Sequence, residues 1–263
     1  MIKTKQFSVS IVIPCYNEEN NLKRGVLDEV YTYLKDQTYI WEVLIANDGS
    51  TDQSLKIVKA FADKHKCFVA IDLPHGGKPS ALEGGLAKAK YDIVLFTDMD
   101  QSTPITELSK LLPYFSQGYQ IVIGSRGAQR NKYSLIRQIA SATFLTIRRF
   151  LLLPSIVDTQ CGFKACKTQI AKKIFPLLAY FQDRTDQSGW VVSAYDVEFL
   201  FIAHKLGYKT KEVRVNWQDE DTSTTKNRGQ KFKKESIQMA KEIYRIKLKD
   251  IKGGYAKDKR KLS

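Results

Sequence analysis

The stretch Asp92–Ile–Val–Leu–Phe–Thr–Asp98–Met–Asp100 decides the fold of this chain. Its apolar run Ile93–Phe96 has the length and β-branched composition of a buried strand, and two carboxylates follow at the carboxyl end of that strand. Residues two apart in an extended segment point the same way, so Asp98 and Asp100 can face one ion. Two carboxylates this close repel each other unless a cation or a proton lies between them. Oxygen ligands of this kind suit Mg²⁺ or Mn²⁺ completed by substrate phosphates, and the alternative is a solvated turn after a strand.

The composition is that of an ordinary soluble globular protein. The 263 residues, 43% hydrophobic and 27% charged, suffice for one large domain or two small ones. Four cysteines without a Cys-x-x-Cys pair and three scattered histidines argue against a zinc site and favour reduced thiols in a cytoplasmic setting. No secretory signal precedes the first strand, and the most apolar stretch, residues 141–157, is broken by Arg148, Arg149 and Pro154. A transmembrane span needs about 20 mostly apolar residues, so none is expected.

The net charge of +14 is unevenly distributed. Residues 126–173 contain ten Lys or Arg against Asp158 alone, and residues 231–263 contain twelve against four acidic residues. Clustered basic charge predicts a polyanionic partner: nucleic acid, an anionic lipid surface or a phosphorylated substrate. The first cluster is interleaved with Leu and Ile rather than with the aromatic residues that stack on bases. The pattern therefore favours lipid over nucleic acid.

Strands and helices alternate through the first hundred residues. The predicted strands are Val9–Ile13, Trp41–Ala46, Phe68–Leu73 and Ile93–Phe96. The helices between them are predicted from residue 20 to about Leu34, at Gln53–Lys64 and at Ser80–Ala89. Later strands are expected at Ile121–Ser125 and Glu212–Trp217. This alternation predicts an α/β fold with a mostly parallel central sheet and helices on both faces.

Polar loops follow the predicted strands, and ligands of such sheets bind beyond the carboxyl ends of the strands. That rule brings residues 16–18, Asp48, Lys78 and the Asp98/Asp100 pair onto one rim. Taken singly, Asp48 is an ordinary turn residue and Lys78 an ordinary solvated lysine. No Gly-x-Gly-x-x-Gly and no Gly-x-x-x-x-Gly-Lys-Ser/Thr occurs, which argues against a dinucleotide dehydrogenase and a P-loop ATPase.

Four motifs together resemble the signature of the family 2 inverting glycosyltransferases. They are Val9–Glu19 (VSIVIPCYNEE), Asn47–Asp52 (NDGSTD), Gly77–Leu82 (GKPSAL) and Asp98–Asp100. The resemblance implies a GT-A fold, a Rossmann-like nucleotide-diphospho-sugar transferase architecture, with a nucleotide-sugar donor and a divalent cation. It implies that Asp98 and Asp100 hold Mg²⁺ or Mn²⁺ on the diphosphate. The residues expected at the donor are Pro14, Tyr16, Glu18, Asp48 and Lys78.

Motifs in the second half of the chain resemble those of dolichyl- and polyprenyl-phosphate sugar synthases. These motifs are Gly124–Ser–Arg126, Arg137-x-x-x-Ser141 and Asp158–Thr–Gln–Cys–Gly–Phe–Lys164. By that resemblance Arg126, Arg137 and Ser141 grip the acceptor phosphate. The segment from about 133 to 153 has helical character with a basic face beside an apolar one, which suits a helix lying at a membrane surface but also a core helix with exposed arginines.

The segments Tyr195–Phe199 and Glu212–Trp217 are most similar to the dolichyl-phosphate glucosyltransferase branch. This resemblance implies UDP-glucose as the donor, with Asp196 orienting hydroxyls of the donor sugar. The expected domains are a catalytic domain over residues 1–230 and a basic amphipathic helix and tail over 231–263. In the helix predicted at Glu235–Asp250, the side chains Ile237, Ala240, Tyr244 and Leu248 share one side.

The sequence thus predicts a peripheral enzyme at the cytoplasmic side of a membrane. One alternative is a glycosyltransferase acting on a hydroxyl of a soluble glycan or protein, with Asp196 or Glu198 as general base. Another is a nucleic-acid-binding protein, which only the net charge suggests.

Overall fold

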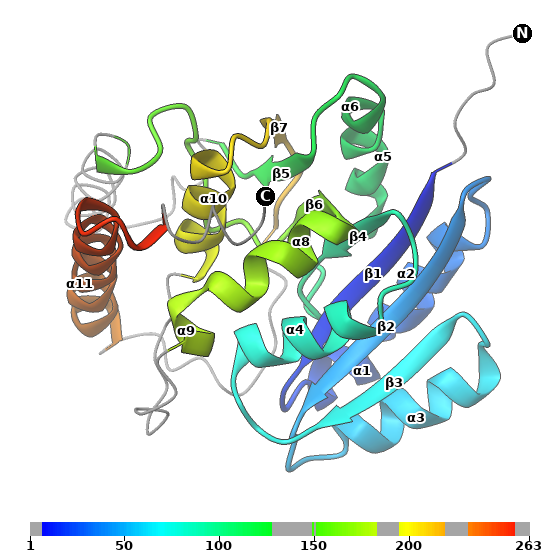
Figure 1. The fold of residues 1–263 in the computed structure, drawn as a ribbon. Helices are drawn as coiled ribbons and strands as arrows, with labels where there is room; N and C mark the ends of the chain where they lie inside the picture. Colours follow the sequence, from blue (N-terminus) through cyan, green and yellow to red (C-terminus); the bar gives the residue numbers. More distant parts are fainter. Residues whose placement is uncertain (1–6, 128–148, 150, 183–194, 219–230, 256–263) are drawn as a thin grey trace, which may run out of the picture.

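A computed structural model describes residues 7–127, 149, 151–182, 195–218 and 231–255, the helix residues 231–239 by their backbone alone. The described chain forms a seven-stranded sheet in the order β3-β2-β1-β4-β6-β5-β7. The pairs β1–β2, β1–β4, β2–β3 and β5–β7 are parallel, whereas β6 is antiparallel to both of its neighbours. The predicted α/β fold with a mostly parallel sheet is confirmed (Figure 1).

Each predicted strand has a counterpart in the sheet. The strands are Ser8–Cys15 (β1), Ile40–Asp48 (β2), Phe68–Leu73 (β3), Ile93–Phe96 (β4), Ile121–Ser125 (β5), Lys164–Lys167 (β6) and Thr210–Arg214 (β7). The last strand ends earlier than predicted, because Asn216 turns away and bonds to Glu107 through its backbone N–H and its side-chain amide, at 3.1 Å each. Strand β6 was not predicted from the sequence.

Helices and two short 3-10 turns fill the connections. They are Glu19–Lys23 (α1), Val26–Leu34 (α2), Ser54–Lys64 (α3), Lys78–Lys88 (α4), Ile105–Glu107 (η1), Leu108–Leu111 (α5), Pro113–Ser116 (α6), Thr168–Ile174 (α8), Phe175–Leu177 (η2), Ala179–Gln182 (α9), Tyr195–Lys205 (α10) and Lys231–Ile251 (α11). The prediction of a single helix from residue 20 to Leu34 is wrong, because this segment forms two helices. Gly25 has φ 90°, a left-handed conformation that interrupts the helix and separates α1 from α2.

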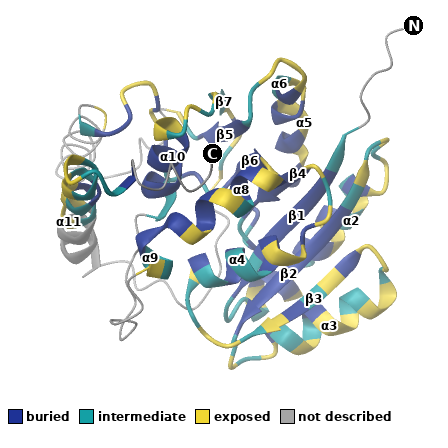
Figure 2. Ribbon diagram, in the orientation of Figure 1, coloured by how far each residue is buried: buried dark blue, intermediate teal, exposed yellow. Residues whose placement is uncertain are grey.

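Two hydrophobic cores lie on opposite faces of the sheet, because successive strand residues point to opposite sides. On β1, Val12 packs with α4, α8 and α10, whereas Ile11 and Ile13 pack with α1, α2 and α5. Strand β4 divides in the same way, with Phe96 on the first side and Leu95 on the second. Figure 2 shows the buried strands enclosed between the two helical layers. This double cover explains why the central strands read as continuous apolar runs.

Helix α4 lies close to the sheet because two glycines face it. A Cβ at Gly85 would collide with Val12 Cγ1, and one at Gly84 would collide with Leu73 Cδ1. Val12 is fully buried and β-branched, so it cannot move aside, whereas Leu73 is partly exposed and flexible.

Gly85→Ala is therefore expected to destabilise the protein by about 1–3 kcal/mol through overpacking. Helix propensity alone predicts the opposite sign, a stabilisation of about 1 kcal/mol. Urea denaturation of Gly85→Ala beside Gly84→Ala, whose neighbour can yield, separates the two effects. Equal or increased stability of Gly85→Ala would show that α4 can shift away from β1.

Candidate active site

The acidic turn after β4 is built by backbone hydrogen bonds. Gln101 adopts a left-handed conformation with φ 49°, and its backbone N–H and its Nε2 both donate to the carbonyl of Asp98, at 3.2 and 2.9 Å. The N–H of Ser102 donates to Asp100 Oδ1 at 2.9 Å. The chain thereby reverses directly after the strand, and both carboxylates reach the same pocket.

That pocket has a volume of about 120 Å³ and lies at the carboxyl edge of the sheet. Its walls come from the turn after β4, the end of β5, the segment before β6 and the segment after β7. The lining residues are Thr97, Asp98, Asp100, Ser102, Thr103, Arg126, Gln160, Gly162, Phe163 and Trp217. The structure therefore brings together three of the predicted site residues, Asp98, Asp100 and Arg126.

Gly162 allows the wall of this pocket to approach Asp98. A Cβ at position 162 would overlap the carboxylate oxygen Oδ2 of Asp98. Only glycine leaves room for both the loop and the carboxylate, so Gly162 is a site residue that the sequence motif contained without revealing its role.

Lys78 begins α4 and pairs with Asp98, its Nζ 2.5 Å from Oδ1. Burial acts to lower the pKa of Lys78, but the surrounding negative charges, that of Asp98 first, together hold the pKa well above its usual value. Both side chains keep about 40% exposure, at 40% for Lys78 and 39% for Asp98. The predicted donor-site lysine and the acidic turn thus meet, and each remains accessible to a ligand.

The loops after β1 and β2 are joined to each other. The side-chain Oδ1 of Asn17 accepts from the N–H of Thr51 at 2.8 Å, and the N–H of Glu18 donates to Ser54 Oγ at 2.8 Å. The N–H of Glu19 also donates to Asp52 at 3.2 Å. The two motifs that the sequence placed on one rim therefore form a single structural unit, with Pro14 opposite Ala46 in the strand register.

Asp48 organises the glycine turn before α4. It is 3% exposed, and its carboxylate accepts from the N–H groups of Gly76 and Gly77 at 2.8 and 2.9 Å. The His75 ring lies 3.0 Å from the same carboxylate and stacks on Tyr16, with ring centroids 4.4 Å apart. Tyr16 and Asp48 were predicted to hold the nucleoside. In this structure they hold the turn, and the nucleoside role stays a prediction.

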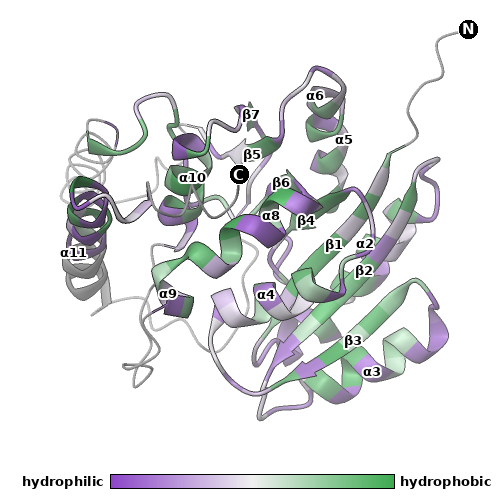
Figure 3. Ribbon diagram, in the orientation of Figure 1, coloured by the Kyte–Doolittle hydropathy of each residue, from purple (hydrophilic) through white to green (hydrophobic). Residues whose placement is uncertain are grey.

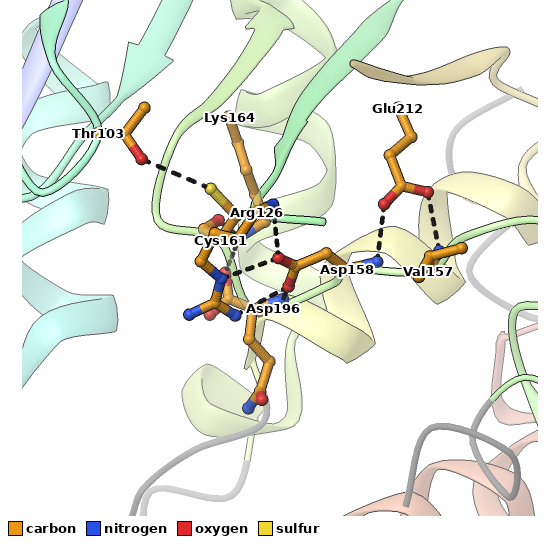
Figure 4. Close-up of polar contacts among 9 residues, drawn as sticks. Thr103, Arg126, Val157, Asp158, Cys161, Lys164, Asp196 and Glu212 are labelled. Atoms are coloured by element: carbon orange, nitrogen blue, oxygen red, sulfur yellow. Dashed lines mark hydrogen bonds and ion pairs between the residues drawn. The ribbon is translucent and has the colours of Figure 1, made fainter. Parts of the chain in front are cut away.

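Arg126, which directly follows β5, is bound by the carboxylate of Asp158, and Asp158 is itself positioned by a second carboxylate, that of Glu212 (Figure 4). Its guanidinium donates to both carboxylate oxygens of Asp158 at 2.8 Å each. The Cζ atom of Arg126 lies 5.8 Å from the centroid of the Trp217 ring. Asp158 is positioned in turn by Glu212 on β7, which accepts from the N–H groups of residues 157 and 158 at 2.8 Å each. This bidentate pair orients Arg126 in the pocket wall.

Asp196, at the start of α10, pairs with Lys164 at the start of β6. Lys164 Nζ lies 2.6 Å from Asp196 Oδ1 and also donates to the carbonyl of Cys161 at 2.5 Å. The two side chains are 5% and 18% exposed. Burial and the charge of Asp196 raise the pKa of the adjacent Tyr195, so its hydroxyl stays protonated. The sequence motif contained Lys164, but nothing in it indicated this partner.

Glu198 is not placed to act as a base, and that part of the hydroxyl-acceptor alternative is wrong. Its carboxylate is 2% exposed and accepts from the N–H of Ala179 at 3.0 Å and from the hydroxyl of Tyr255 at 2.7 Å. It lies outside the acidic pocket and joins α10 to the first residue of α9 and to Tyr255, which follows α11. Asp196 and Glu198, two residues apart on a helix, point to different sides.

The donor set fits a hard divalent cation. Asp98 and Asp100 supply carboxylate oxygens to one pocket, whose lining does not include Gln101. Those described residues contain no group of three or more His, Cys, Asp or Glu arranged to hold a metal ion. A cation at this turn would therefore need oxygens from a substrate to complete its shell, as Mg²⁺ and Mn²⁺ sites on diphosphates do.

Arg137 and Ser141, with most of the helix predicted at 133–153, lie outside the described residues. In the described ranges, none of the helices combines the length and the apolar character that crossing a bilayer requires.

The sheet order and the two helical layers are those of the GT-A fold, with an acidic pocket at the carboxyl edge of the sheet. Residues 10–175 match the family described as "Glycosyl transferase family 2", and the chain belongs to that family.

Similar sequences include dolichyl-phosphate beta-glucosyltransferases. The enzyme of Trichomonas vaginalis is 32% identical over 252 residues, which cover 90% of this chain and 72% of that protein. The enzyme of Mus musculus is 32% identical over 273 residues, which cover 96% of this chain and 78% of that protein.

Similar solved structures show the same fold at lower identity. Mannosyl-3-phosphoglycerate synthase from Rubrobacter xylanophilus has a TM-score of 0.61 and 14% identity, covering 91% of this chain and 73% of its own. Glucosyl-3-phosphoglycerate synthase from Mycobacterium tuberculosis, solved with Mn²⁺, uridine-diphosphate and glucosyl-3-phosphoglycerate, has a TM-score of 0.56 and 20% identity, covering 93% and 79%.

Removal of Lys164 tests the buried ion pair. Lys164→Met leaves Asp196 nearly buried without its ammonium partner and is expected to cost about 3–5 kcal/mol in the free energy of unfolding. The double variant Lys164→Met/Asp196→Asn is expected to recover part of that loss, because no unpaired charge remains. Lys78→Met is the matched control, since its pair with Asp98 is solvent-exposed and contributes at most about 1 kcal/mol. Equal losses in the single and double variants would contradict a structural ion pair.

Proposed function

We propose that the chain transfers glucose, with inversion, from UDP-glucose to a polyprenyl phosphate such as undecaprenyl or dolichyl phosphate. The observation that carries the proposal is the similarity to dolichyl-phosphate beta-glucosyltransferases over most of the chain. The acidic pocket supports it, because Asp98 and Asp100 can hold a divalent cation, which is the counter-charge that a nucleotide diphosphate needs. A uridine-diphosphate complex of a protein with the same fold supports the choice of nucleotide.

Asp98 and Asp100 are the residues that would hold Mg²⁺ or Mn²⁺. When bound, the cation neutralises charge that develops on the departing diphosphate. Lys78 would add a second positive charge beside Asp98, since its amine stays protonated. Pro14, Tyr16, Glu18 and Asp48 would border the nucleoside on the joined loops after β1 and β2.

The acceptor phosphate needs little activation, because its second pKa is about 6 and it is ionised near neutral pH. Arg126 lines the pocket with a fixed orientation and would bind this phosphate, together with Arg137 and Ser141. These residues would align one phosphate oxygen with the anomeric carbon.

Asp196 would orient hydroxyls of the donor sugar. Its pairing with Lys164 keeps it as a hydrogen-bond acceptor of fixed position, whereas a general base must take up and release a proton. A hydroxyl acceptor would need such a base, so this ion pair favours the phosphate acceptor.

The enzyme would act as a peripheral protein at the cytoplasmic side of a membrane. The lipid acceptor and the basic clusters at 126–173 and 231–263 support this placement.

Transfer of labelled glucose from UDP-glucose to undecaprenyl or dolichyl phosphate is the direct test. We expect activity with Mg²⁺ or Mn²⁺ and its loss in EDTA, and Asp98→Asn should lower the rate by about a hundredfold or more, roughly 2.7 kcal/mol. Asp28→Asn, an exposed carboxylate on α2, is the control. Full activity in EDTA would exclude the metal role, and absence of transfer to lipid phosphate would exclude the proposed acceptor.

Two kinetic series separate the acceptor site from the donor site. Arg137→Ala should reduce kcat/KM for the lipid phosphate by roughly ten- to a hundredfold, the loss of one charge-assisted contact of about 1.5–3 kcal/mol, with donor binding near normal. Asp196→Asn should instead raise the KM for the sugar nucleotide. If rising pH rescues Asp196→Asn, proton abstraction is restored as its role and the hydroxyl acceptor becomes the better interpretation.

A further inference from the structure

Helix α11 packs on the protein with only part of its apolar surface. Ile243 and Ile246 are 2% and 1% exposed and belong to the same core as α8 and α10. Tyr255, just beyond the helix, is 3% exposed and joins that core as well. These residues form the inner face of α11.

A second apolar stripe runs along the same helix on the solvent side. It consists of Ala240, Tyr244, Leu248 and Ile251, all of them exposed, the last three at 68%, 36% and 72%. With 3.6 residues per turn these four positions fall within an arc of about 80° and extend along about 17 Å of the helix. We call this stripe the outer face of α11. Within the described part of the chain, the inner face makes the contacts of α11 with the core, and the outer face is exposed.

Basic residues border the outer face on both sides. Lys241 and Lys252 are exposed and follow the stripe on one border, and Lys247 precedes it on the other. The acids of this part of the helix are turned away: Glu242 pairs with Arg245 at 2.6 Å, and Asp250 pairs with Lys205 of α10 at 2.7 Å. Asp250 also lies 3.7 Å from Lys247, a longer contact than the one to Lys205. Figure 3 shows hydrophobic and hydrophilic bands side by side on α11.

The geometry points to an anionic lipid bilayer as the partner of the outer face. We propose that α11 lies in the plane of the membrane interface, with Tyr244, Leu248 and Ile251 among the acyl chains. Lys241, Lys247 and Lys252 then reach the phosphate headgroups with their amines, while their aliphatic stems follow the apolar stripe. This inference rests on the proposed function, which requires contact with a membrane-embedded acceptor.

A lipid surface fits better than a protein partner. A stable protein interface covers about 800 Å² on each side, much more than one stripe of four side chains offers. Lysines on both borders match a surface that is negative on every side, and the segment 231–263 has twelve Lys or Arg against four acids. In Figure 1, α11 lies at the left edge of the view.

The attachment of α11 connects the outer face with the active site. Tyr255 donates to the buried Glu198 on α10 at 2.7 Å, and Lys249 donates to Gln182 at the end of α9 at 2.9 Å. The same helix α10 begins with Asp196 in the site. A membrane bound by the outer face therefore has a constant position relative to the catalytic pocket.

The apolar part of the proposal is tested by co-sedimentation with vesicles of phosphatidylcholine mixed with phosphatidylglycerol. Tyr244→Ser/Ile251→Ser should weaken the partition by about tenfold or more, equivalent to about 1.4 kcal/mol. The matched control is Ile40→Ser/Val69→Ser, two exposed apolar residues at the opposite end of the sheet, 52% and 38% exposed. Equal binding of wild type and the α11 variant would overturn the proposal.

The contribution of the border lysines is tested separately, by comparing anionic with neutral vesicles. Lys241→Gln/Lys252→Gln should bind the anionic vesicles about tenfold more weakly, with little change on vesicles of phosphatidylcholine alone, and high salt should reproduce the effect on wild type. A wild-type dimer in light scattering that Tyr244→Ser/Ile251→Ser abolishes, without vesicle binding, would assign the outer face to a second copy of the chain and overturn the proposal.

The acceptor assay keeps this inference distinct from the proposed function. The outer-face variants should lose transfer to polyprenyl phosphate in vesicles and keep transfer to the same lipid dispersed in detergent. If wild type binds vesicles by the outer face but transfers no glucose in either form, the proposed function fails and the membrane contact stands.

Discussion

A buried ammonium group is costly unless a carboxylate and hydrogen-bond acceptors surround it, and Lys164 is such a group in this protein. Its amine bonds to Asp196 and to the carbonyl of Cys161, so the segment before β6 and the start of α10 cannot separate. Because β6 runs antiparallel between β4 and β5, its first residue lies at the carboxyl edge of its neighbours. The ion pair therefore fixes the segment before β6, which contributes Gly162 and Phe163 to the wall of the acidic pocket.

Carboxylates divide into two kinds around this edge of the sheet. Asp48 and Asp158 are buried and accept backbone or guanidinium N–H groups, which gives the surrounding loops a defined shape. Asp98 keeps 39% exposure and faces the pocket with Asp100. The first kind holds the loops in place, and the second kind is presented to ligands. The diphosphate and divalent cation of the proposed function would bind to the second kind, while the first kind keeps the loops in shape.

Helix α11 extends the same logic to the periphery. Its inner face contributes Ile243 and Ile246 to the core, and Glu198 ties its end to α10 through Tyr255. Its outer face presents an apolar stripe bordered by lysines, the arrangement that is typical of helices at a lipid interface. A helix that packs on the core with one face and binds a membrane with the other would hold the catalytic pocket at a constant distance from the bilayer. The proposed lipid-linked acceptor requires such a constant distance.

Local sequence pattern was enough to predict the strands β1 to β5, because each is an apolar run closed by turn residues. It also determined the family, because its motifs keep their order, and the shared rim, because parallel strands end together. It did not reveal β6, whose residues Lys164–Lys167 have lysines at both ends and no apolar run. Nor did it assign Glu198 correctly or show which side of α11 is buried. These points, and the pairing of Lys164 with Asp196, 32 positions apart, became visible only in the folded chain. Burial and charge pairing depend on proximity in space, about which local periodicity carries no information.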